Sequence, residues 1–143
     1  MAQFEIIVGS VLGASEYVAE ALQQELENQT HQVNLHFAPD LLEINQQAIW
    51  LICSSTHGAG DLPDNIQPFI EQVKNVALDN LEFLIVGLGD SSYDTFCFAA
   101  QKIEDELLKQ NAKLLTPSLH IDVLNHPIPE DVAVEWLKNW LSN

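Results

Sequence analysis

The amino-acid sequence predicts an α/β fold, in which a doubly wound, five-stranded parallel sheet carries helices on both faces. Short apolar runs alternate along the chain with longer amphipathic segments. The apolar runs are nearly unbroken, as in IWLIC at 49–53, which is typical of strands that are buried on both faces. Right-handed crossovers between such strands favour the sheet order 2-1-3-4-5.

The first half of the chain predicts three strands and two helices. Residues 4–8 are the first strand, and 15–28 form a helix because apolar residues recur there every three or four positions. Residues 32–37 alternate between polar and apolar and predict a second strand, and 48–54 predict a third. After a long polar loop, a helix is expected at about 65–76.

The second half continues the alternation. Residues 81–88 predict the fourth strand and 93–111 the next helix. A fifth strand is expected over 114–123, where Pro117 allows a break. The last helix, over 129–141, starts with a proline, which is favoured in the first turn. No repeat or linker interrupts this pattern, so we expect one domain over residues 1–143.

The composition is globular, but the charge is strongly unbalanced. Of 143 residues, 47% are hydrophobic and 18% are charged, and 21 acidic residues face five lysines and no arginine, for a net charge of −16. This charge repels phosphate backbones and anionic membranes, so we expect neither nucleic-acid nor membrane binding. A basic protein partner is the natural complement.

The sequence also predicts a compartment. It has no apolar run of the 18 residues that a membrane span needs, and its first residues lack the features of a signal peptide. Cys53 and Cys97 are isolated in apolar stretches and form no CxxC motif. We therefore expect two reduced structural thiols, no metal site and a cytoplasmic location.

A loop of small residues, GSVLGAS at 9–15, follows the first strand. Backbone N–H groups at a helix start, together with the hydroxyls of Ser10 and Ser15, suit an anion such as phosphate. The glycine spacing matches neither the dinucleotide nor the P-loop pattern, so neutral dipoles alone would hold the phosphate. The alternative is a tight turn in which Ser15 caps the helix.

The loop after the third strand, SSTHGAGDLPDN at 54–65, contains three consecutive hydroxyl residues, a histidine and two glycines. This composition favours a functional loop, in which His57 places a flat ring against a ligand and the Gly58 peptide is free to rotate. The alternative is a solvent-exposed loop in which Asp64 or Asn65 starts the next helix.

The loop after the fourth strand reads GLGDSSYDTFC at 87–97. Its small residues permit close backbone approach, and Tyr93 presents an aromatic face at the edge of the sheet where such folds bind ligands. The alternative makes Tyr93 a surface aromatic residue at the start of a helix.

These three loops, in this order, resemble the cofactor loops of the short-chain flavodoxin family. The run at 87–97 resembles the second isoalloxazine-binding loop, the run at 9–15 is similar to the phosphate loop, and 55–58 falls at the first flavin loop. The segments at 54–65 and 120–140 further resemble the MioC-type flavodoxin-like proteins. The resemblance covers essentially the whole chain and implies FMN as cofactor.

The resemblance also implies a role for each loop. The first would hold the FMN phosphate, Tyr93 would stack on the isoalloxazine ring, and His57 would flank its other face. Gly58 would lie by flavin N5, and Asp90 would contact the pyrimidine edge. The implied cofactor-binding residues are Ser10, Val11, Leu12, Gly13, Ala14, Ser15, Ser55, Thr56, His57, Gly58, Ala59, Gly60, Leu88, Gly89, Asp90, Tyr93, Phe96 and Cys97.

Two positions depart from the family pattern. Val11 and Leu12 stand where threonine is frequent, and the loss of hydroxyl contacts predicts FMN binding that is weaker by about tenfold or more. His57 stands where flavodoxins commonly carry Trp or Tyr, so we expect a flavin potential that rises as the pH falls through the pKa of this histidine.

The function that the resemblance implies is electron transfer, with no catalytic residue of the chain's own. The expected partners are a basic flavoprotein reductase of the ferredoxin/flavodoxin–NADP reductase type and an acceptor enzyme, with biotin synthase implied by the MioC-type resemblance. We expect a monomer or a weak homodimer. The alternative, favoured by Val11 and Leu12, is a flavodoxin-shaped interaction or regulatory module that binds FMN weakly or not at all.

Overall fold

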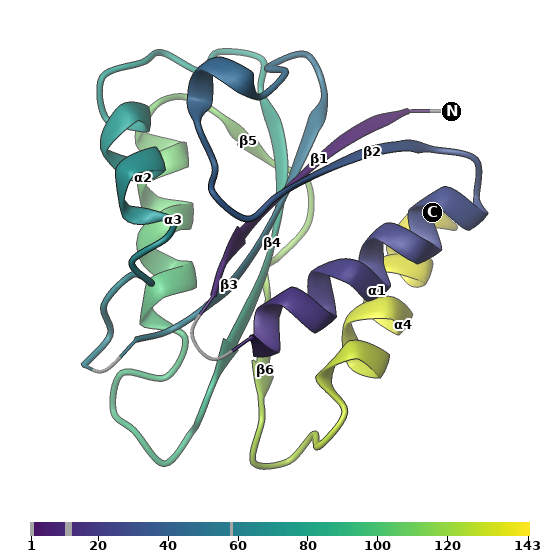
Figure 1. The fold of residues 1–143 in the computed structure, drawn as a ribbon, viewed down its shortest axis with the longest axis vertical. Coiled ribbons are helices and arrows are strands. Elements are labelled where there is room, and N and C mark those ends of the chain that lie inside the picture. Colours follow the sequence, from purple (N-terminus) through teal and green to yellow (C-terminus); the bar gives the residue numbers. More distant parts are fainter. Residues whose placement is uncertain (1, 11–12, 58) are drawn as a thin grey trace.

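The computed structural model describes residues 2–10, 13–57 and 59–143, and it confirms the predicted fold class and strand order (Figure 1). The strands form a parallel sheet in the order β2-β1-β3-β4-β5, and β6 also pairs with β4. Their bounds are β1 (Gln3–Gly9), β2 (Gln32–His36), β3 (Ile49–Ser55), β4 (Glu82–Gly89), β5 (Lys113–Leu114) and β6 (Leu119–Asp122).

The fifth position of the sheet is divided. Instead of one strand over 114–123, the short strands β5 and β6 both pair with β4, so the expected five-stranded sheet has six strand segments. Pro117 lies in the gap between them, and proline has no N–H to donate to a strand ladder. The break is therefore where the sequence allowed it.

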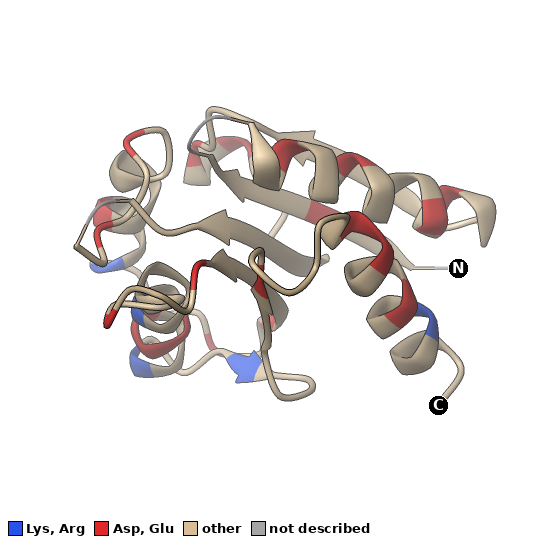
Figure 2. Cartoon of the chain, turned by 90° about the horizontal axis from the view of Figure 1, so that it is seen from below, with Lys and Arg blue, Asp and Glu red and all other residues tan. Residues whose placement is uncertain are grey.

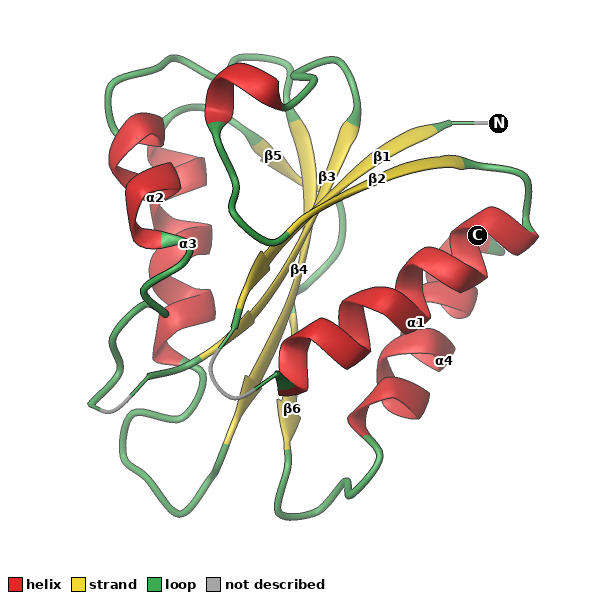
Figure 3. Cartoon of the chain, viewed as in Figure 1, coloured by secondary structure: helices red, strands yellow, loops and turns green. Residues whose placement is uncertain are grey.

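Two helices cover each face of the sheet (Figures 1 and 3). The pair α1 and α4 lies on one face, and the pair α2 and α3 lies on the other. The helices are α1 (Ala14–Asn28), α2 (Gln67–Val73), α3 (Phe98–Lys109) and α4 (Pro129–Leu141), and a short 3-10 helix, η1 (Leu41–Glu43), follows β2. In the described ranges, no helix is long and apolar enough to cross a membrane.

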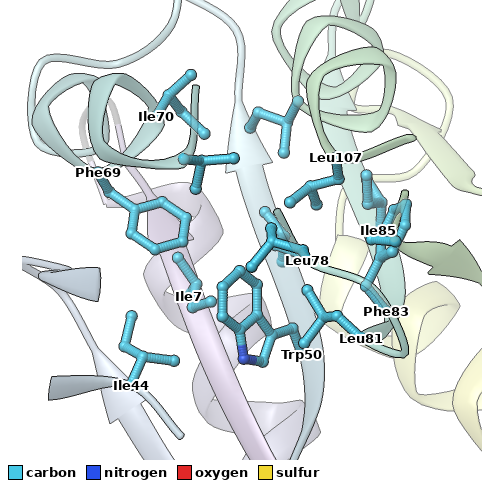
Figure 4. Packing of buried hydrophobic residues seen from close by; sticks show 14 of the residues in the cluster. Ile7, Ile44, Trp50, Phe69, Ile70, Leu78, Leu81, Phe83, Ile85 and Leu107 are labelled. Atoms are coloured by element: carbon cyan, nitrogen blue, oxygen red, sulfur yellow. The ribbon is translucent and has the colours of Figure 1, made fainter. Parts of the chain in front are cut away.

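The alternation of side chains along the central strands produces two cores. In β3, Leu51 and Cys53 pack toward α1 and α4, whereas Trp50 and Ile52 pack toward α2 and α3. The second of these cores surrounds the Trp50 ring, which lies 5.5 Å from the ring of Phe69 between centroids (Figure 4). Because both faces are buried, the strands needed the unbroken apolar runs from which they were predicted.

Two helices are shorter than the sequence pattern predicts. α2 covers 67–73 instead of 65–76, and α3 begins at Phe98 instead of at residue 93. Residues 91–97 form turns, and Cys97, just before α3, has a left-handed backbone with φ of 55°. The apolar spacing continues through 93–97 because Phe96 is partly buried and Cys97 is fully buried. These residues nevertheless belong to a loop and not to the helix.

Candidate functional site

A cavity of about 530 Å³ opens at the carboxyl ends of β3 and β4. Its walls come from the two loops that follow these strands, and its volume is in the range of sites for small ligands and cofactors. The lining residues are Thr56, Ala59, Gly89, Asp90, Tyr93, Asp94, Thr95, Phe96 and Cys97. Two loops singled out in the sequence, more than 30 residues apart, thus meet in one site.

The loop after β4 supplies most of the cavity wall. Tyr93 is 63% exposed, so its aromatic face is accessible at the rim. Its backbone N–H donates to the carbonyl of Asp90 at 3.1 Å, and the Asp90 carboxylate accepts from the backbone N–H and hydroxyl of Ser92 at 2.8 and 2.6 Å. Asp90 therefore closes the turn that presents Tyr93.

Gly89 lets this loop fold back on itself. A Cβ atom at Gly89 would lie 2.8 Å from the backbone nitrogen of Cys97 and 3.0 Å from Cδ1 of Phe96. Both distances are below normal van der Waals contact, so only glycine fits without movement. This close approach is what the small residues of the sequence motif predict.

Cys97 contributes a neutral thiol to the cavity wall. Burial, and to a smaller extent the nearby negative charge of Asp122, raise its pKa to about 12. Burial likewise raises the pKa of Cys53, which lies in the core on the α1 side. Both cysteines are free and buried, as expected from their apolar sequence contexts.

The loop after β3 is fixed by two hydrogen bonds to α3. Lys102 donates from Nζ to the carbonyl of Gly60 at 2.7 Å, and the backbone N–H of Ala99 donates to Oγ1 of Thr56 at 3.4 Å. His57 and Asp61 exchange backbone hydrogen bonds of 2.8 Å. His57 and Asp61 are therefore held together by their backbones.

His57 does not line the cavity that Tyr93 borders. It is exposed and lines a separate groove of about 630 Å³, whose other residues include Asp61, Asp64, Glu71 and Lys102. Among the remaining predicted residues, Ser55 at the end of β3, Leu88 in β4 and Gly60 in the loop after β3 are buried. Gly58 lies outside the described residues.

The loop between β1 and α1 contributes none of its described residues to the lining of this cavity. Gly13 precedes α1 with φ of +86°, a left-handed conformation that favours glycine. Ser15 does not cap the helix. It lies inside the first turn, buried, and its hydroxyl donates to the carbonyl of Gly9 at 2.6 Å. Val11 and Leu12 lie outside the described residues.

Asn65 holds this first loop in place and does not start α2. Its Oδ1 accepts from the backbone N–H of Ser10 at 2.9 Å, and its Nδ2 donates to the carbonyls of Val8 at 2.6 Å and Phe37 at 2.9 Å. One side chain thus ties the ends of β1 and β2 to the second loop. The residue that precedes α2 is Ile66, and no side chain caps the helix there.

Sequence reasoning missed the roles of two residues that organise the site, Asn65 and Asp122. Asp122 ends β6, and its carboxylate accepts hydrogen bonds from Ser91 in the loop that carries Tyr93. Each residue forms hydrogen bonds with groups more than 30 positions away in the sequence, so no local periodicity reveals this role. The only available signal was residue type, since Asn and Asp at strand ends readily bond to backbone groups.

Negative charge surrounds this end of the molecule. Figure 2 shows acidic segments on the loops and on both helix layers, with fewer basic segments among them. Asp90 and Asp94 line the cavity, and Lys102 is directed to the carbonyl of Gly60. The site therefore presents an aromatic, negatively charged rim.

The chain matches known flavodoxins over nearly its full length. The flavodoxin family model matches residues 6–136. Protein MioC of Escherichia coli K12 is 44% identical over 99% of this chain and 98% of its own. The MioC homolog of Haemophilus influenzae is 45% identical over 95% of this chain and 94% of its own.

A solved structure gives the same result in three dimensions. A cysteine-to-alanine mutant of flavodoxin from Pseudomonas aeruginosa superimposes with a TM-score of 0.90 and 29% identity, and the match covers 98% of this chain and 97% of that chain. The overall fold of this chain thus has a counterpart in an experimental structure.

Proposed function

Because this chain belongs to the flavodoxin family, we propose that it carries electrons one at a time from a basic flavoprotein reductase to an acceptor enzyme. Members of this family are FMN-binding electron carriers and do not convert a substrate. The proposal rests on one observation: the loops after β3 and β4 line the same cavity, and Tyr93 is exposed at its rim.

The cavity suits a flat aromatic ring. Small residues, Ala59 and Gly89, lie in its wall beside the rings of Tyr93 and Phe96. Such a wall leaves room for a planar group, and exposed tyrosine faces stack well on aromatic ligands. Tyr93 and the backbone of Gly89 and Asp90 would hold the isoalloxazine ring.

The phosphate would lie at the start of α1. A 15-residue helix presents unpaired backbone N–H groups and the positive end of its dipole there. Gly13 and Ala14 would hold the phosphate with backbone groups, and Ser10 with its hydroxyl. Glu16 opposes this binding, since its carboxylate lies in the first turn, 3.3 Å from where a Cβ of Gly13 would be.

FMN, when bound, supplies the one-electron chemistry. The chain sets the potential through charge: Asp90, Asp94 and Asp122 place negative charge at or near the cavity, and Cys97 stays neutral. Additional negative charge on the bound group is therefore disfavoured. About 1.4 kcal/mol of repulsion lowers a one-electron potential by roughly 59 mV.

The partners are proposed from surface chemistry. A net charge of −16 steers basic surfaces toward the protein, and Tyr93 and Phe98, 63% and 45% exposed, supply apolar contact near the cavity. A reductase of the ferredoxin/flavodoxin–NADP reductase type fits this surface, and the MioC-type resemblance makes biotin synthase the acceptor to test first. Both free thiols suit a cytoplasmic, reducing environment.

Stopped-flow reduction of the FMN-loaded protein by such a reductase and NADPH tests this proposal. We expect a second-order rate that falls steeply between about 50 and 500 mM salt, because screening removes electrostatic steering. A rate that is independent of salt, or no reduction of an FMN-loaded protein, would contradict the proposed partner chemistry.

A further inference from the structure

Asp122 connects two loops at the end of the sheet. It pairs with Gly89 in the β4–β6 register, and the backbone N–H of Val123 donates to the carbonyl of Gly89 at 2.9 Å. Its carboxylate therefore lies beside the point where β4 becomes the loop that carries Tyr93. This position places one side chain between the end of β6 and the rim of the cavity.

The carboxylate accepts hydrogen bonds from both loops. On the β4 side, Ser91 donates from its hydroxyl and from its backbone N–H, the latter at 3.2 Å. On the β6 side, the backbone N–H of Leu124 donates at 3.0 Å and Nδ2 of Asn125 donates at 3.0 Å. These bonds hold the pKa of Asp122 below its usual value, with the hydroxyl of Ser91 as the largest cause, so the carboxylate stays ionised at neutral pH.

The loop from Ser91 to Asp94 has little else to hold it. All four residues are exposed, so apolar burial contributes little to their position. The turn closed by Asp90 fixes its internal shape but not its place relative to the sheet. The contact between Asp122 and Ser91 supplies that placement.

We infer that Asp122 is a positioning residue for FMN, which fixes the loop of Asp90 and Tyr93 against β6 before the cofactor binds. This inference rests on the proposed function. A loop that is already in its bound position loses less conformational entropy on binding, so removal of the anchor weakens the cofactor's affinity. Asp122 needs no contact with FMN for this effect.

The direction of the effect separates positioning from charge. If Asp122 acted only through its charge, Asp122→Asn would tighten the binding of anionic FMN, because one repulsive charge is removed. Positioning predicts the opposite, a dissociation constant that rises by about tenfold. Riboflavin, which lacks the phosphate, would weaken by a similar factor, since the anchored loop faces the ring.

The experiment compares Asp122→Asn, Ser91→Ala and their double variant with the unmodified protein. FMN affinity comes from fluorescence quenching, and amide hydrogen exchange of Ser91 and Ser92 is followed without FMN. We expect both single variants to weaken FMN, the double variant to be no weaker than Asp122→Asn alone, and exchange at Ser91 to accelerate in each. Asp79→Asn is the matched control, because Asp79 is exposed in the turn before β4, at the opposite end of the sheet.

The outcomes distinguish the two claims. Wild-type affinity, or tighter binding, in both single variants overturns the role of Asp122 and leaves the proposed function standing. Unchanged hydrogen exchange at Ser91 in Asp122→Asn also overturns it. Absence of saturable FMN binding in the unmodified protein overturns the proposed function itself. If Asp122→Asn does not fold, Ser91→Ala alone decides, because Ser91 is exposed and its hydroxyl bonds to Asp122.

Discussion

Two glycines of β4 differ in what a methyl group would meet. At Gly87 a Cβ would lie 2.5 Å from Cβ of Ala100 in α3, and at Gly89 it would lie 2.8 Å from the backbone nitrogen of Cys97. Carbon atoms pack at about 3.5–4.0 Å, so both alanine variants force movement. Only the second clash involves the cavity loop through its backbone.

We expect Gly87→Ala and Gly89→Ala each to lower stability by about 1–3 kcal/mol, the usual cost of overpacking. For 143 residues, each kcal/mol lowers the melting temperature by about 3 °C. Both variants should therefore melt about 3–10 °C lower in a thermal scan followed by circular dichroism.

Two measurements distinguish Gly87 from Gly89: whether a second substitution restores stability, and whether FMN affinity changes. Ala100→Gly removes the atom that Gly87→Ala meets, at a helix-propensity cost of about 1 kcal/mol, so the double variant should be more stable than the sum of the single effects predicts. No side-chain truncation relieves Gly89→Ala, because its nearest neighbour is backbone. That variant should weaken FMN about tenfold, whereas Gly87→Ala stays within about threefold.

This reasoning is refuted by either of two results. One is that Gly87→Ala lowers the stability of the Ala100→Gly variant by as much as it lowers that of the unmodified protein. The other is a Gly89→Ala protein that binds FMN with unchanged affinity while folding normally.

Further perturbations probe the phosphate loop, the ring site, the core and the thiol. Glu16→Gln should strengthen FMN binding about threefold but leave riboflavin unchanged, since it removes a carboxylate from the first turn of α1; equal changes for both ligands in a fluorescence titration would contradict this. Tyr93→Ala should weaken FMN and riboflavin alike, about fivefold or more, because it removes stacking area; Tyr17→Ala, an equally exposed tyrosine on α1, is its control in the same titration. Leu137→Ala in α4 should cost about 2–5 kcal/mol in urea unfolding, because this side chain is fully buried between α4 and the sheet; a cost below about 1 kcal/mol would mean that the core on this face is loosely packed. The pKa of Cys97 is raised from 9.0 to about 12, so the neutral thiol stabilises the fold below pH 9, and this stabilisation is lost as the pH rises from 9 toward 12. When the free energy of unfolding is measured against pH, it should therefore fall less steeply above pH 9 in Cys97→Ala than in the unmodified protein.

The elements that the sequence predicted correctly are those whose periodicity burial enforces. The strands β1, β3 and β4 follow the apolar runs that two buried faces require, and the helix α4 follows the 3–4 spacing of one buried face. The break between β5 and β6 follows from a proline that cannot join the ladder. These features depend on one residue or one short run at a time.

The early start predicted for α3 failed for a different reason. Residues 93–97 carry apolar side chains at helical spacing, but they bend around a cavity, and Cys97 takes a left-handed backbone conformation. The organising roles of Asn65 and Asp122 arise from side-chain bonds to distant backbone groups. Such bonds depend on the folded arrangement, so a sequence pattern could suggest the loops but not what holds them.

The most direct test of the whole account is a titration of the cofactor-free protein with FMN, with riboflavin as the matched ligand without phosphate. The account predicts saturable quenching of FMN fluorescence and weaker binding of riboflavin, because the proposed phosphate site at the start of α1 has no group to bind in riboflavin. No quenching by FMN at about 100 μM would contradict the account, since this is far above the concentration at which a working carrier must bind its cofactor. The chain would then be a flavodoxin-shaped interaction module.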